Sequence, residues 1–347
     1  MNSRISVVIP TYNRSRLVGR AVESALANIM SGDEIIVIDD GSTDDTAEIL
    51  RPFYDKIRYI RTENSGPGAA RNLGVKRSMH SLVTFLDSDD EWLADKLYLQ
   101  RTVMDAFPHV VFSFSNMLAR RPDGEMVSNI LNLWRNDPRV GYKDVRESLD
   151  EILGAGIPFS SIGYLPADRA DFNVHMGDIY KPLMEVSYVW TCTVMVRKEI
   201  AGTSFWFAED QHLCEDWECY GRLAKLGFVA YLNCELAVQI VHSETSRLSD
   251  VGDIQMATSR IKMLHRVWGA DDSFLRVHSS RFQSILNAQH LWRAKCLIKE
   301  GRMEEAKEDL RLAGGGPWSY RLLTSMSPRL IDTFLRLRRK MRILTKG

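Results

Sequence analysis

The first hundred residues alternate short apolar runs with segments of helical periodicity, and this alternation limits the possible fold more than any other feature. The runs ISVVIP, EIIVIDD, IRYIR and LVTFLD are rich in β-branched residues. Helical patterns separate them, most clearly over residues 14–29, where apolar residues recur three and four positions apart. Continuous apolar strands separated by helices predict an α/β fold whose mostly parallel sheet is buried on both faces.

The rest of the chain continues this pattern and then becomes helical. Further strands are expected at VVFSFS, CTVMVRK and FVAYLN, and a helix is expected from Asp216 to Leu226. From about residue 253 onward the pattern is helical, and LNAQHLWRAKCLIKEGRMEEAKEDLRLA resembles one tetratricopeptide-like hairpin that turns at Gly301. The sequence therefore predicts an α/β domain over 1–250 and an all-α C-terminal region over 251–347.

Between Asn116 and Tyr188 the pattern is irregular and rich in Gly, Pro and Asp. A stretch of this length inside a compact domain is commonly a functional insertion or a lid. It contains Trp134 and the segment GIPFSSIGYLP, whose aromatic rings could stack on a ligand. We therefore expect this stretch to border a binding pocket.

Charge and cysteine content narrow the class of protein. Lys plus Arg and Asp plus Glu both number 45, so the net charge of +0 does not point to nucleic acid. The five cysteines are odd in number and form no C-x-x-C pair, which favours a reducing compartment over a disulfide framework or a zinc site. The N-terminus enters a strand without a signal-peptide pattern, and no apolar stretch is long enough to span a bilayer. These features favour a cytoplasmic location.

The stretch TFLDSDDEWL places three aspartates within four positions directly after an apolar run. Asp87, Asp89 and Asp90 repel one another when they are ionised and close together. A divalent cation would offset this repulsion, because hard cations are bound through carboxylate oxygens. A helix start is the alternative, with Ser88 or Asp89 as the N-cap. Taken by itself, the stretch leaves both interpretations open.

Four polar signals follow the four predicted strands, and in open α/β sheets ligands bind beyond the carboxyl ends of the strands. Turn and capping chemistry can explain any one signal, but not so easily the convergence of four. An aromatic ring suits a base, carboxylates suit a base, a ribose or a metal, and a guanidinium suits phosphate. The sequence thus predicts a nucleotide-diphosphate site. The signals are Pro10-Thr11-Tyr12-Asn13, Asp39-Asp40-Gly41-Ser42, Asn64-Ser65-Gly66-Pro67-Gly68 with Arg71, and Asp87-Ser88-Asp89.

A dehydrogenase is a weaker alternative. GPGAAR resembles the start of a dinucleotide-binding fingerprint, and Asp87 follows at a suitable spacing. That fingerprint follows the first strand and needs Gly or Ala at its third glycine position. Here the motif follows the third strand and Arg71 takes that position, so a dehydrogenase is disfavoured.

The motifs VVIPTYNR, VIDDGSTDDT, NSGPGAARNLGV and LDSDDEWL stand in the order and spacing of family 2 glycosyltransferases. CEDWECYGRLAKLG resembles the Glu-Asp catalytic motif of that family, and VQIVHSETSRLS resembles a segment that places His and Ser near the donor diphosphate. The resemblance implies a GT-A, Rossmann-like sheet flanked by helices, with a nucleotide-binding half over 1–115 and an acceptor-binding half over 116–250. It also implies an inverting transferase with a nucleotide-sugar donor, for which UDP is preferred, and a glycan or lipid-linked acceptor.

The resemblance also implies roles for single residues. Asp216 would be the catalytic base, and Asp89 and His242 would bind Mn²⁺ or Mg²⁺. The sequence departs from the family pattern in two places. Val238-Gln239 stands where the family usually has Tyr-Arg before the late His, which bears on the role of His242. The Gln-x-x-Arg-Trp motif of polymerising synthases is absent, which argues against a polymerising synthase. The nucleotide would be bound by Pro10, Thr11, Tyr12, Asn13, Asp40, Gly68, Arg71, Asp87 and Ser88.

Other functions remain open at this point. An inert nucleotide-sugar-binding or scaffold protein could act through its helical C-terminus, and a nucleotidyltransferase would require a basic residue that we do not identify. The tail RLIDTFLRLRRKMRILTKG, which begins at Arg329, carries seven basic residues and one acid. It suits either an interfacial helix on anionic lipid, which would place the protein at the inner face of the membrane, or a solvated helix end.

Overall fold

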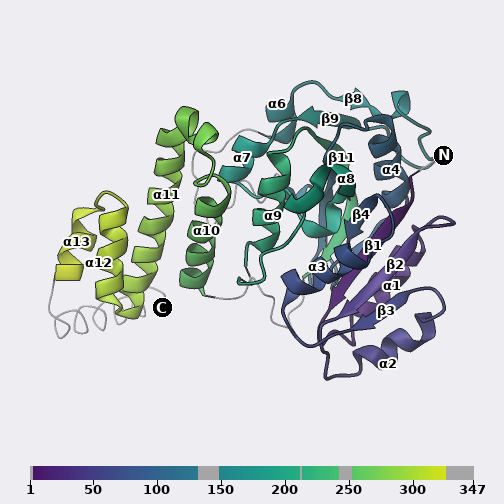
Figure 1. The fold of residues 1–347 in the computed structure, drawn as a ribbon, viewed down its shortest axis with the longest axis horizontal. Helices are drawn as coiled ribbons and strands as arrows, with labels where there is room; N and C mark the ends of the chain where they lie inside the picture. The colour runs from purple at the N-terminus through teal and green to yellow at the C-terminus, as the bar shows by residue number, and fades with distance from the viewer. Residues whose placement is uncertain (1–2, 132–147, 212, 242–251, 326–347) are drawn as a thin grey trace. The chain divides into compact units, whose positions relative to one another are not determined.

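The computed structural model describes residues 3–131, 148–211, 213–241 and 252–325. The chain divides into two compact units, residues 1–246 and 247–347. The first unit contains one mixed sheet with helices around it, and the second contains the described helices of the C-terminal region (Figure 1). Helices within the described ranges lack the length and apolar character needed to cross a bilayer.

Parallel pairing defines the N-terminal part of the sheet. Strands β3, β2, β1 and β4 lie side by side in that order and pair in parallel. Beyond β4 the sheet continues in the order β10, β6, β11, β9 and β8. Strand β10 runs antiparallel to both neighbours, whereas β6 and β11 are parallel. The predicted α/β class is confirmed, with antiparallel pairing in the second half. The strands of this main order are β1 Ile5–Thr11, β2 Glu34–Asp39, β3 Arg58–Arg61, β4 Leu82–Phe85, β6 Phe112–Arg120, β8 Ile157–Pro158, β9 Asn173–Gly177, β10 Met195–Arg197 and β11 Val229–Ile240.

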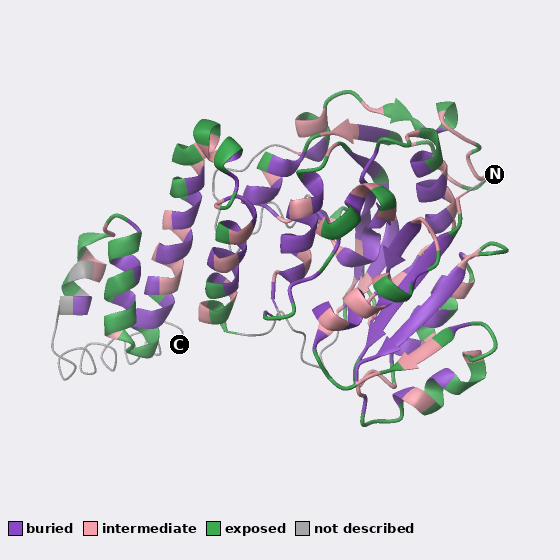
Figure 2. Ribbon diagram, in the orientation of Figure 1, coloured by how far each residue is buried: buried purple, intermediate pink, exposed green. Residues whose placement is uncertain are grey.

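Helices cover both faces of the sheet, and the strands at its centre are buried (Figure 2). Ile5, Val7 and Ile9 of β1 belong to the core cluster formed with helices α1 and α4, because alternate strand residues share a face. Val8 points the other way, toward α3. The α-helices of this unit are α1 Val18–Leu26, α2 Thr46–Leu50, α3 Pro67–Arg77, α4 Lys96–Ala106, α6 Leu149–Leu153, α7 Tyr180–Glu185, α8 Lys198–Ala201 and α9 Glu215–Ala224.

Helix α3 packs unusually close to β1. A Cβ atom built on Gly74 would lie 2.2 Å from Val8 Cγ1, a distance at which two carbon atoms clash. Glycine at this position therefore allows the helix backbone to approach the sheet. On the same face, Tyr220 of α9 contacts Phe112 and Phe207. Helices α3 and α9 thus share the face opposite α1 and α4.

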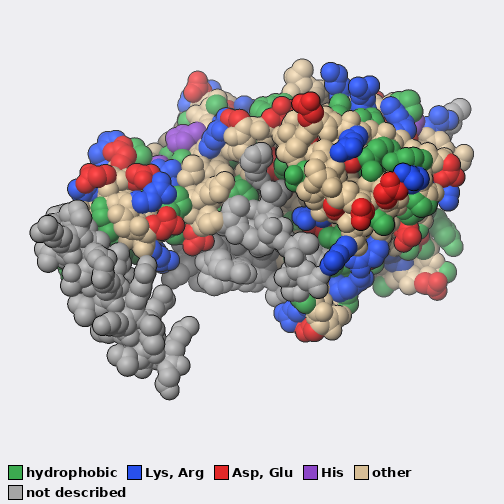
Figure 3. Space-filling view, turned by 90° about the horizontal axis from the view of Figure 1, so that it is seen from below, with side chains coloured by type: hydrophobic (Ala, Val, Ile, Leu, Met, Phe, Trp, Pro, Cys, Tyr) green, Lys and Arg blue, Asp and Glu red, His purple; other side chains and the backbone are tan. Residues whose placement is uncertain are grey.

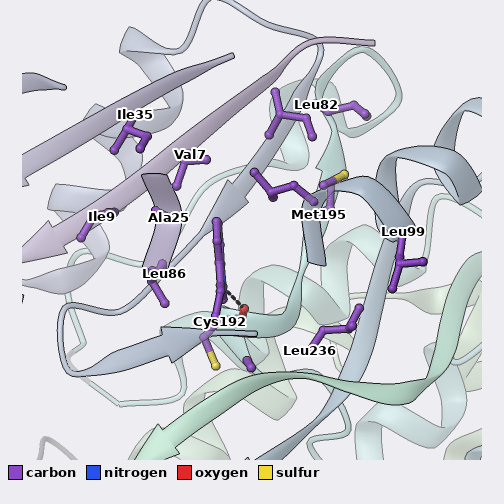
Figure 4. Packing of buried hydrophobic residues seen from close by; sticks show 14 of the residues in the cluster. Val7, Ile9, Ala25, Ile35, Leu82, Leu86, Leu99, Cys192, Met195 and Leu236 are labelled. Carbon is purple, nitrogen blue, oxygen red and sulfur yellow. Dashed lines mark hydrogen bonds between the residues drawn. The ribbon is translucent and has the colours of Figure 1, made fainter. Parts of the chain in front are cut away.

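The core between β4, β10 and β11 is shown in Figure 4, where Leu86, Met195 and Leu236 surround Cys192. Cys192 belongs to the 3₁₀-helix η4, Thr191–Thr193. The other 3₁₀-helices are η1 Arg51–Phe53, η3 Phe159–Ser161 and η5 Gly202–Ser204. These apolar contacts hold η4 against the sheet, a position that matters for the site.

The structure excludes one of the alternatives left open by the sequence and corrects one prediction. The acidic motif does not start a helix: Asp90–Trp92 form strand β5, which pairs antiparallel with β11, and α4 starts only at Lys96. Tertiary pairing with a distant strand outweighs local capping chemistry here. The stretch predicted to be irregular also contains regular strands, because β9 joins the main sheet beside β11 and Met126–Val127 form β7 beside β6.

The C-terminal unit is helical, as predicted. It contains α10 Asp253–Val267, α11 Asp272–Glu300, α12 Met303–Leu312 and α13 Trp318–Ser325. Gly301 ends α11 in the left-handed region with φ of 80°, so the predicted turn between α11 and α12 is confirmed. Asp309, fully buried on α12, accepts hydrogen bonds from Arg293 on α11 at 2.7 and 2.8 Å.

The face drawn in Figure 3 carries both basic and acidic side chains, in keeping with the zero net charge.

Candidate active site

The parallel strands bring the four polar signals to one edge of the sheet. Thr11 at the end of β1 is in register with Asp39 at the end of β2, and Asp39 is in register with Arg61 of β3. The Asp40 amide donates to the Thr11 carbonyl at 2.9 Å, which extends the pairing past the strand ends. The edge predicted from the strand order is therefore present.

The loop after β1 presents one aromatic ring to solvent. Tyr12 is 46% exposed, which leaves its ring available to stack on a base. Asn13 adopts φ of 51°, and its side-chain oxygen accepts from the Thr43 amide at 2.8 Å. Its own amide donates to Ser42 Oγ at 3.0 Å. Asn13 thus fixes the loops after β1 and β2 against each other, while Pro10 and Thr11 are buried behind Tyr12.

Asp40 holds the loop that precedes α3. Its carboxylate accepts from the Ser65 amide at 2.9 Å and from the Gly66 amide at 2.8 Å. Gly68, in the first turn of α3, faces the Ala208 carbonyl, which would lie 2.8 Å from an added Cβ. Asp40 and Gly68 therefore both have a role in the packing of the backbone here. The nucleotide contacts predicted for them stay predictions.

Arg71 is the centre of a cluster of charges formed with Asp87, Glu215 and Asp216, here called the Arg71 cluster. One guanidinium nitrogen donates to Asp87 at 2.7 Å, and the other donates to Glu215 at 2.8 Å. The guanidinium is nearly buried and lies 5.4 Å from the centre of the Phe207 ring. The phosphate contact predicted for Arg71 stays a prediction, and it would have to compete with these two carboxylates.

The polar edge at the ends of β1, β2, β3 and β4 is here called the donor edge, because the sequence predicts the nucleotide-sugar donor there. The Arg71 cluster joins the donor edge to the start of α9. Asp216, the predicted base, is half-buried at the start of α9. The Trp217 amide donates to Asp216 Oδ1 at 2.7 Å, and the Thr191 hydroxyl donates to Oδ2 at 3.3 Å. A partly exposed carboxylate held by two donors is suited to accept a proton from a bound hydroxyl.

Burial changes the protonation of the cluster. It raises the pKa of Glu215 to about 7, and the negative charge of Asp216 adds to that effect. Desolvation also raises the pKa of Asp216, while Arg71 acts in the opposite direction. Burial disfavours the charge of Arg71, but Asp87 and Glu215 outweigh it and raise the pKa of the guanidinium. One cation therefore faces three carboxylates, and a proton on Glu215 relieves part of the repulsion near neutral pH.

The carboxylates of the acidic motif are suited to bind a divalent cation that is also bound by the diphosphate of a nucleotide sugar. The side chains of Asp87 and Asp89 are 27% and 23% exposed, so both are accessible from the sheet edge. Arg14 lies 3.8 Å from Asp89, farther than a direct hydrogen bond. No set of three potential ligands is found within the described ranges, but Mg²⁺ commonly uses one or two carboxylates plus phosphate oxygens. Ser88 is buried between the two acids, and His242 lies outside the described residues.

Comparisons with known proteins identify the family of this chain. The model of glycosyl transferase family 2 matches residues 6–161. An uncharacterized glycosyltransferase, RT0329 of Rickettsia typhi, is 37% identical over 317 residues, which is 90% of this chain and 86% of the relative. The chain belongs to glycosyltransferase family 2.

Other relatives of this glycosyltransferase are similar over a shorter region. Uncharacterized glycosyltransferases of Rickettsia felis and Rickettsia conorii are 37% and 36% identical over 131 residues, 37% of this chain. This match spans only about a fifth of their length, 22% in each. The shared region thus says little about the activity of the whole relatives.

Solved structures support the fold. S. aureus TarS 1-349, in complex with UDP-GlcNAc, has a TM-score of 0.59 and 16% identity, and the match covers 98% of this chain and 91% of the TarS 1-349 chain. The mannosyltransferase PcManGT from Pyrobaculum calidifontis, in complex with GDP-Man and Mn²⁺, has a TM-score of 0.52 and 16% identity, covering 97% and 84%. At such identity these likenesses establish the fold of this glycosyltransferase, and they confirm the predicted GT-A class.

Sequence reasoning missed several partners in the site of this glycosyltransferase. Arg71 and Glu215 are 144 residues apart, and no local pattern links them. Asn72, which the sequence also left unassigned, donates to the Phe207 carbonyl at 2.9 Å and accepts from the Phe207 amide at 2.7 Å. Thr191 carried no signal at all, because an isolated threonine has none. Such contacts between distant segments become visible only in the folded chain.

Proposed function

We propose that this glycosyltransferase moves a sugar, with inversion, from a nucleotide diphosphate sugar to a hydroxyl of a glycan or lipid-linked acceptor. The observation that carries the proposal is the position of Asp216, at the start of α9 and linked through Arg71 to the acidic edge at Asp87. A single inverting displacement needs one carboxylate for the acceptor proton and a separate group for the leaving diphosphate. The two ends of the Arg71 cluster supply this division.

In the proposed reaction the acceptor oxygen attacks the anomeric carbon from the face opposite the diphosphate. The bond from the anomeric carbon to the diphosphate oxygen breaks, and its electron pair leaves with the nucleoside diphosphate. Asp216 takes the proton of the attacking hydroxyl. Its raised pKa makes the ionised carboxylate a stronger base than one in water. Arg71 holds Glu215 beside the base and Asp87 on the donor side.

The donor is proposed to lie along the sheet edge. Tyr12 would stack on the base, and Asp40 and Asp87 would face the base and the ribose. Asp89 would bind Mn²⁺ or Mg²⁺ together with the diphosphate, and the cation would neutralise the charge that develops on the leaving group. A role of His242 in the same metal site is part of the proposal. TarS is seen with UDP-GlcNAc and PcManGT with GDP-Man and Mn²⁺, which supports a nucleotide-sugar donor and a divalent cation without choosing the base.

The acceptor is proposed to approach over the segment that precedes β9. Tyr164 is 74% exposed there, so its ring is available to a sugar face, whereas Phe159 is fully buried and stacks on Phe172. Trp134, predicted to act in the same region, lies outside the described residues. A lipid-linked acceptor would fit the basic tail from Arg329, which also lies outside them and which we propose as a contact with anionic membrane.

A donor screen tests the proposed function. UDP-, GDP- and dTDP-sugars are incubated with the protein and Mn²⁺ or Mg²⁺, and release of the nucleoside diphosphate is measured. We expect UDP release from a uridine donor, dependent on the cation and increased by a matching acceptor. NMR of the product should show an inverted anomeric centre. A folded protein that neither binds nor cleaves any nucleotide sugar would instead support an inert scaffold.

A further inference from the structure

Side chains from three elements hold the short helix η4 in place. The Trp92 indole donates to the Cys192 carbonyl at 2.8 Å, the dashed contact at Cys192 in Figure 4. Gln100 donates to the Thr193 carbonyl at 2.9 Å, and Thr84 donates to the Val194 carbonyl at 2.5 Å. Buried carbonyl groups need such partners, and here three consecutive carbonyls are each bound by a different side chain. Helix η4 therefore has little freedom to shift.

A buried lysine stabilises these side chains. Lys96 is fully buried, and its Nζ atom donates to the Thr84 hydroxyl at 2.6 Å. The same atom lies 4.0 Å from the centre of the Trp92 ring. Lys96 thus contacts two of the three side chains that bind η4. Trp92 and Lys96 come from the segment that follows the acidic motif, so the donor edge and η4 share one support.

Thr191, the first residue of η4, faces the start of α9. Its hydroxyl donates to Asp216 Oδ2 at 3.3 Å, while the Trp217 amide donates to Oδ1 at 2.7 Å. With one donor on each oxygen, the carboxylate is restrained from rotating. We propose that Thr191 is a positioning residue, whose hydroxyl holds the Asp216 carboxylate in the orientation that accepts the acceptor proton. This inference rests on the proposed function, in which Asp216 is the base.

The hydrogen bond also favours the ionised form of Asp216, because a hydroxyl donor stabilises a carboxylate more than a carboxylic acid. Tyr220 is neutral beside it, since burial raises the pKa of its phenol. Loss of the Thr191 hydroxyl should therefore make Asp216 harder to ionise and free to rotate. The charged and titratable groups that act on Asp216 are Arg71 from α3, Asp87 from the end of β4, and Glu215, Cys219 and Tyr220 from α9 itself.

The substitution Thr191→Val tests the inference, because it removes the hydroxyl and keeps the shape of the side chain. Thr193→Val is the matched control: Thr193 is buried in the same short helix, but its hydroxyl donates to the Trp190 carbonyl at 2.8 Å. Thr191→Ser is the rescue variant, since it restores a donor at the same position. All three are made in the full chain.

The first measurement is kcat against pH with the donor found in the screen. In Thr191→Val the acidic limb should move to higher pH, with turnover about fivefold to tenfold below wild type on that limb and KM for the donor nearly unchanged. Thr193→Val should stay within about twofold of wild type at every pH, and Thr191→Ser should recover most of the loss. An acidic limb that is the same in both valine variants overturns the inference.

The second measurement does not depend on activity. Burial raises the pKa of folded Asp216 above its unfolded value, so stability decreases as pH rises through the folded pKa. Without the Thr191 hydroxyl this decrease should be larger. Between about pH 5 and about pH 8, the Tm of Thr191→Val should fall about 2–4 °C more than that of Thr193→Val. Equal falls in Tm overturn the inference. If the wild type cleaves no donor, the proposed function fails, and this second measurement still decides whether Thr191 acts on Asp216.

Discussion

The donor edge and the start of α9 are both built from carboxylates, but these carboxylates differ in their exposure to water. Asp87 and Asp89 keep about a quarter of their side-chain surface exposed, and a cation from solvent can reach them. Glu215 is only 7% exposed, and its counter-charge is the built-in guanidinium of Arg71. Asp87 shares that guanidinium at 2.7 Å, so within the edge it is the charge of Asp89 that we propose is offset by a ligand.

This difference shows how one site can separate binding from proton transfer. A carboxylate near water can exchange metal ions. A desolvated carboxylate holds its proton more tightly, so it is a stronger base once ionised. Arg71 touches both regions and therefore couples them.

The largest effect is expected from removing that coupling. Arg71→Met keeps the volume of the side chain but leaves Asp87, Glu215 and Asp216 without their cation. Breaking a buried ion pair in this way costs about 3–5 kcal/mol of unfolding free energy, measured by urea denaturation. The double variant Arg71→Met with Glu215→Gln should recover part of the loss. Arg58→Ala breaks a partly exposed pair with Glu34 and is the control. Equal losses for Arg58→Ala and Arg71→Met would mean that the Arg71 cluster adds nothing special.

The next effect should appear in catalysis and not in binding. Asp216→Asn keeps size and shape but cannot take the acceptor proton, so kcat should fall about 10²-fold or more. Affinity for UDP and metal, measured by calorimetry, should stay nearly intact, and Glu215→Gln should cost less turnover. Near wild-type transfer by Asp216→Asn would place the base elsewhere. A product that retains the donor configuration would reject the single displacement.

A third effect concerns pH. The pKa of Glu215 is raised to about 7, above its unfolded value, so the folded state binds a proton more tightly. Stability should therefore decrease as pH rises from the unfolded pKa toward the folded one, and Glu215→Gln should remove about 2 kcal/mol of that decrease. Denaturant titrations of both proteins at several pH values measure it. Parallel curves for wild type and variant would show that Glu215 ionises normally.

The smallest effect is expected at the donor edge, where the ligand supplies the cation. Asp89→Ala should weaken UDP binding about tenfold in the presence of Mn²⁺ and hardly at all in its absence. Asp55→Ala, which removes an exposed carboxylate from the same half of the domain, is the control. Calorimetry with and without the cation measures both. Unchanged affinity with Mn²⁺ would remove Asp89 from the metal site.

The fold of the N-terminal half could be predicted because its signals are local. Runs such as ISVVIP and EIIVIDD are buried on both faces in the structure, and their many β-branched residues predict strands. Strand β5 could not be predicted in this way. It has three residues, two of them acidic, and it exists because Asp90–Trp92 pair with residues 237–239 of β11. Pairing across such a sequence distance leaves no pattern in either segment.

The candidate site also contains residues that the sequence reveals and residues that it does not. The edge motifs around Tyr12, Asp40 and Asp87 follow strands that the sequence reveals, so their convergence could be deduced. Their partners could not: Ser65 and Gly66 bind Asp40 through backbone amides, which any residue except proline could supply. Sequence reasoning therefore finds residues with distinctive side chains and misses the ordinary groups that orient them.

The close contact of Gly74 with Val8 has a consequence for redesign. Helix α3 carries Arg71 one turn before Gly74, so the depth at which the helix rests on the sheet also sets the height of the guanidinium above the strands. A methyl group added at Gly74 would lift the helix, and trimming Val8 to alanine would make room for it. Substitutions that enlarge one of these two side chains and shorten the other would change the height of Arg71 in small steps. We expect them to change the distance between the donor edge and Asp216 as well.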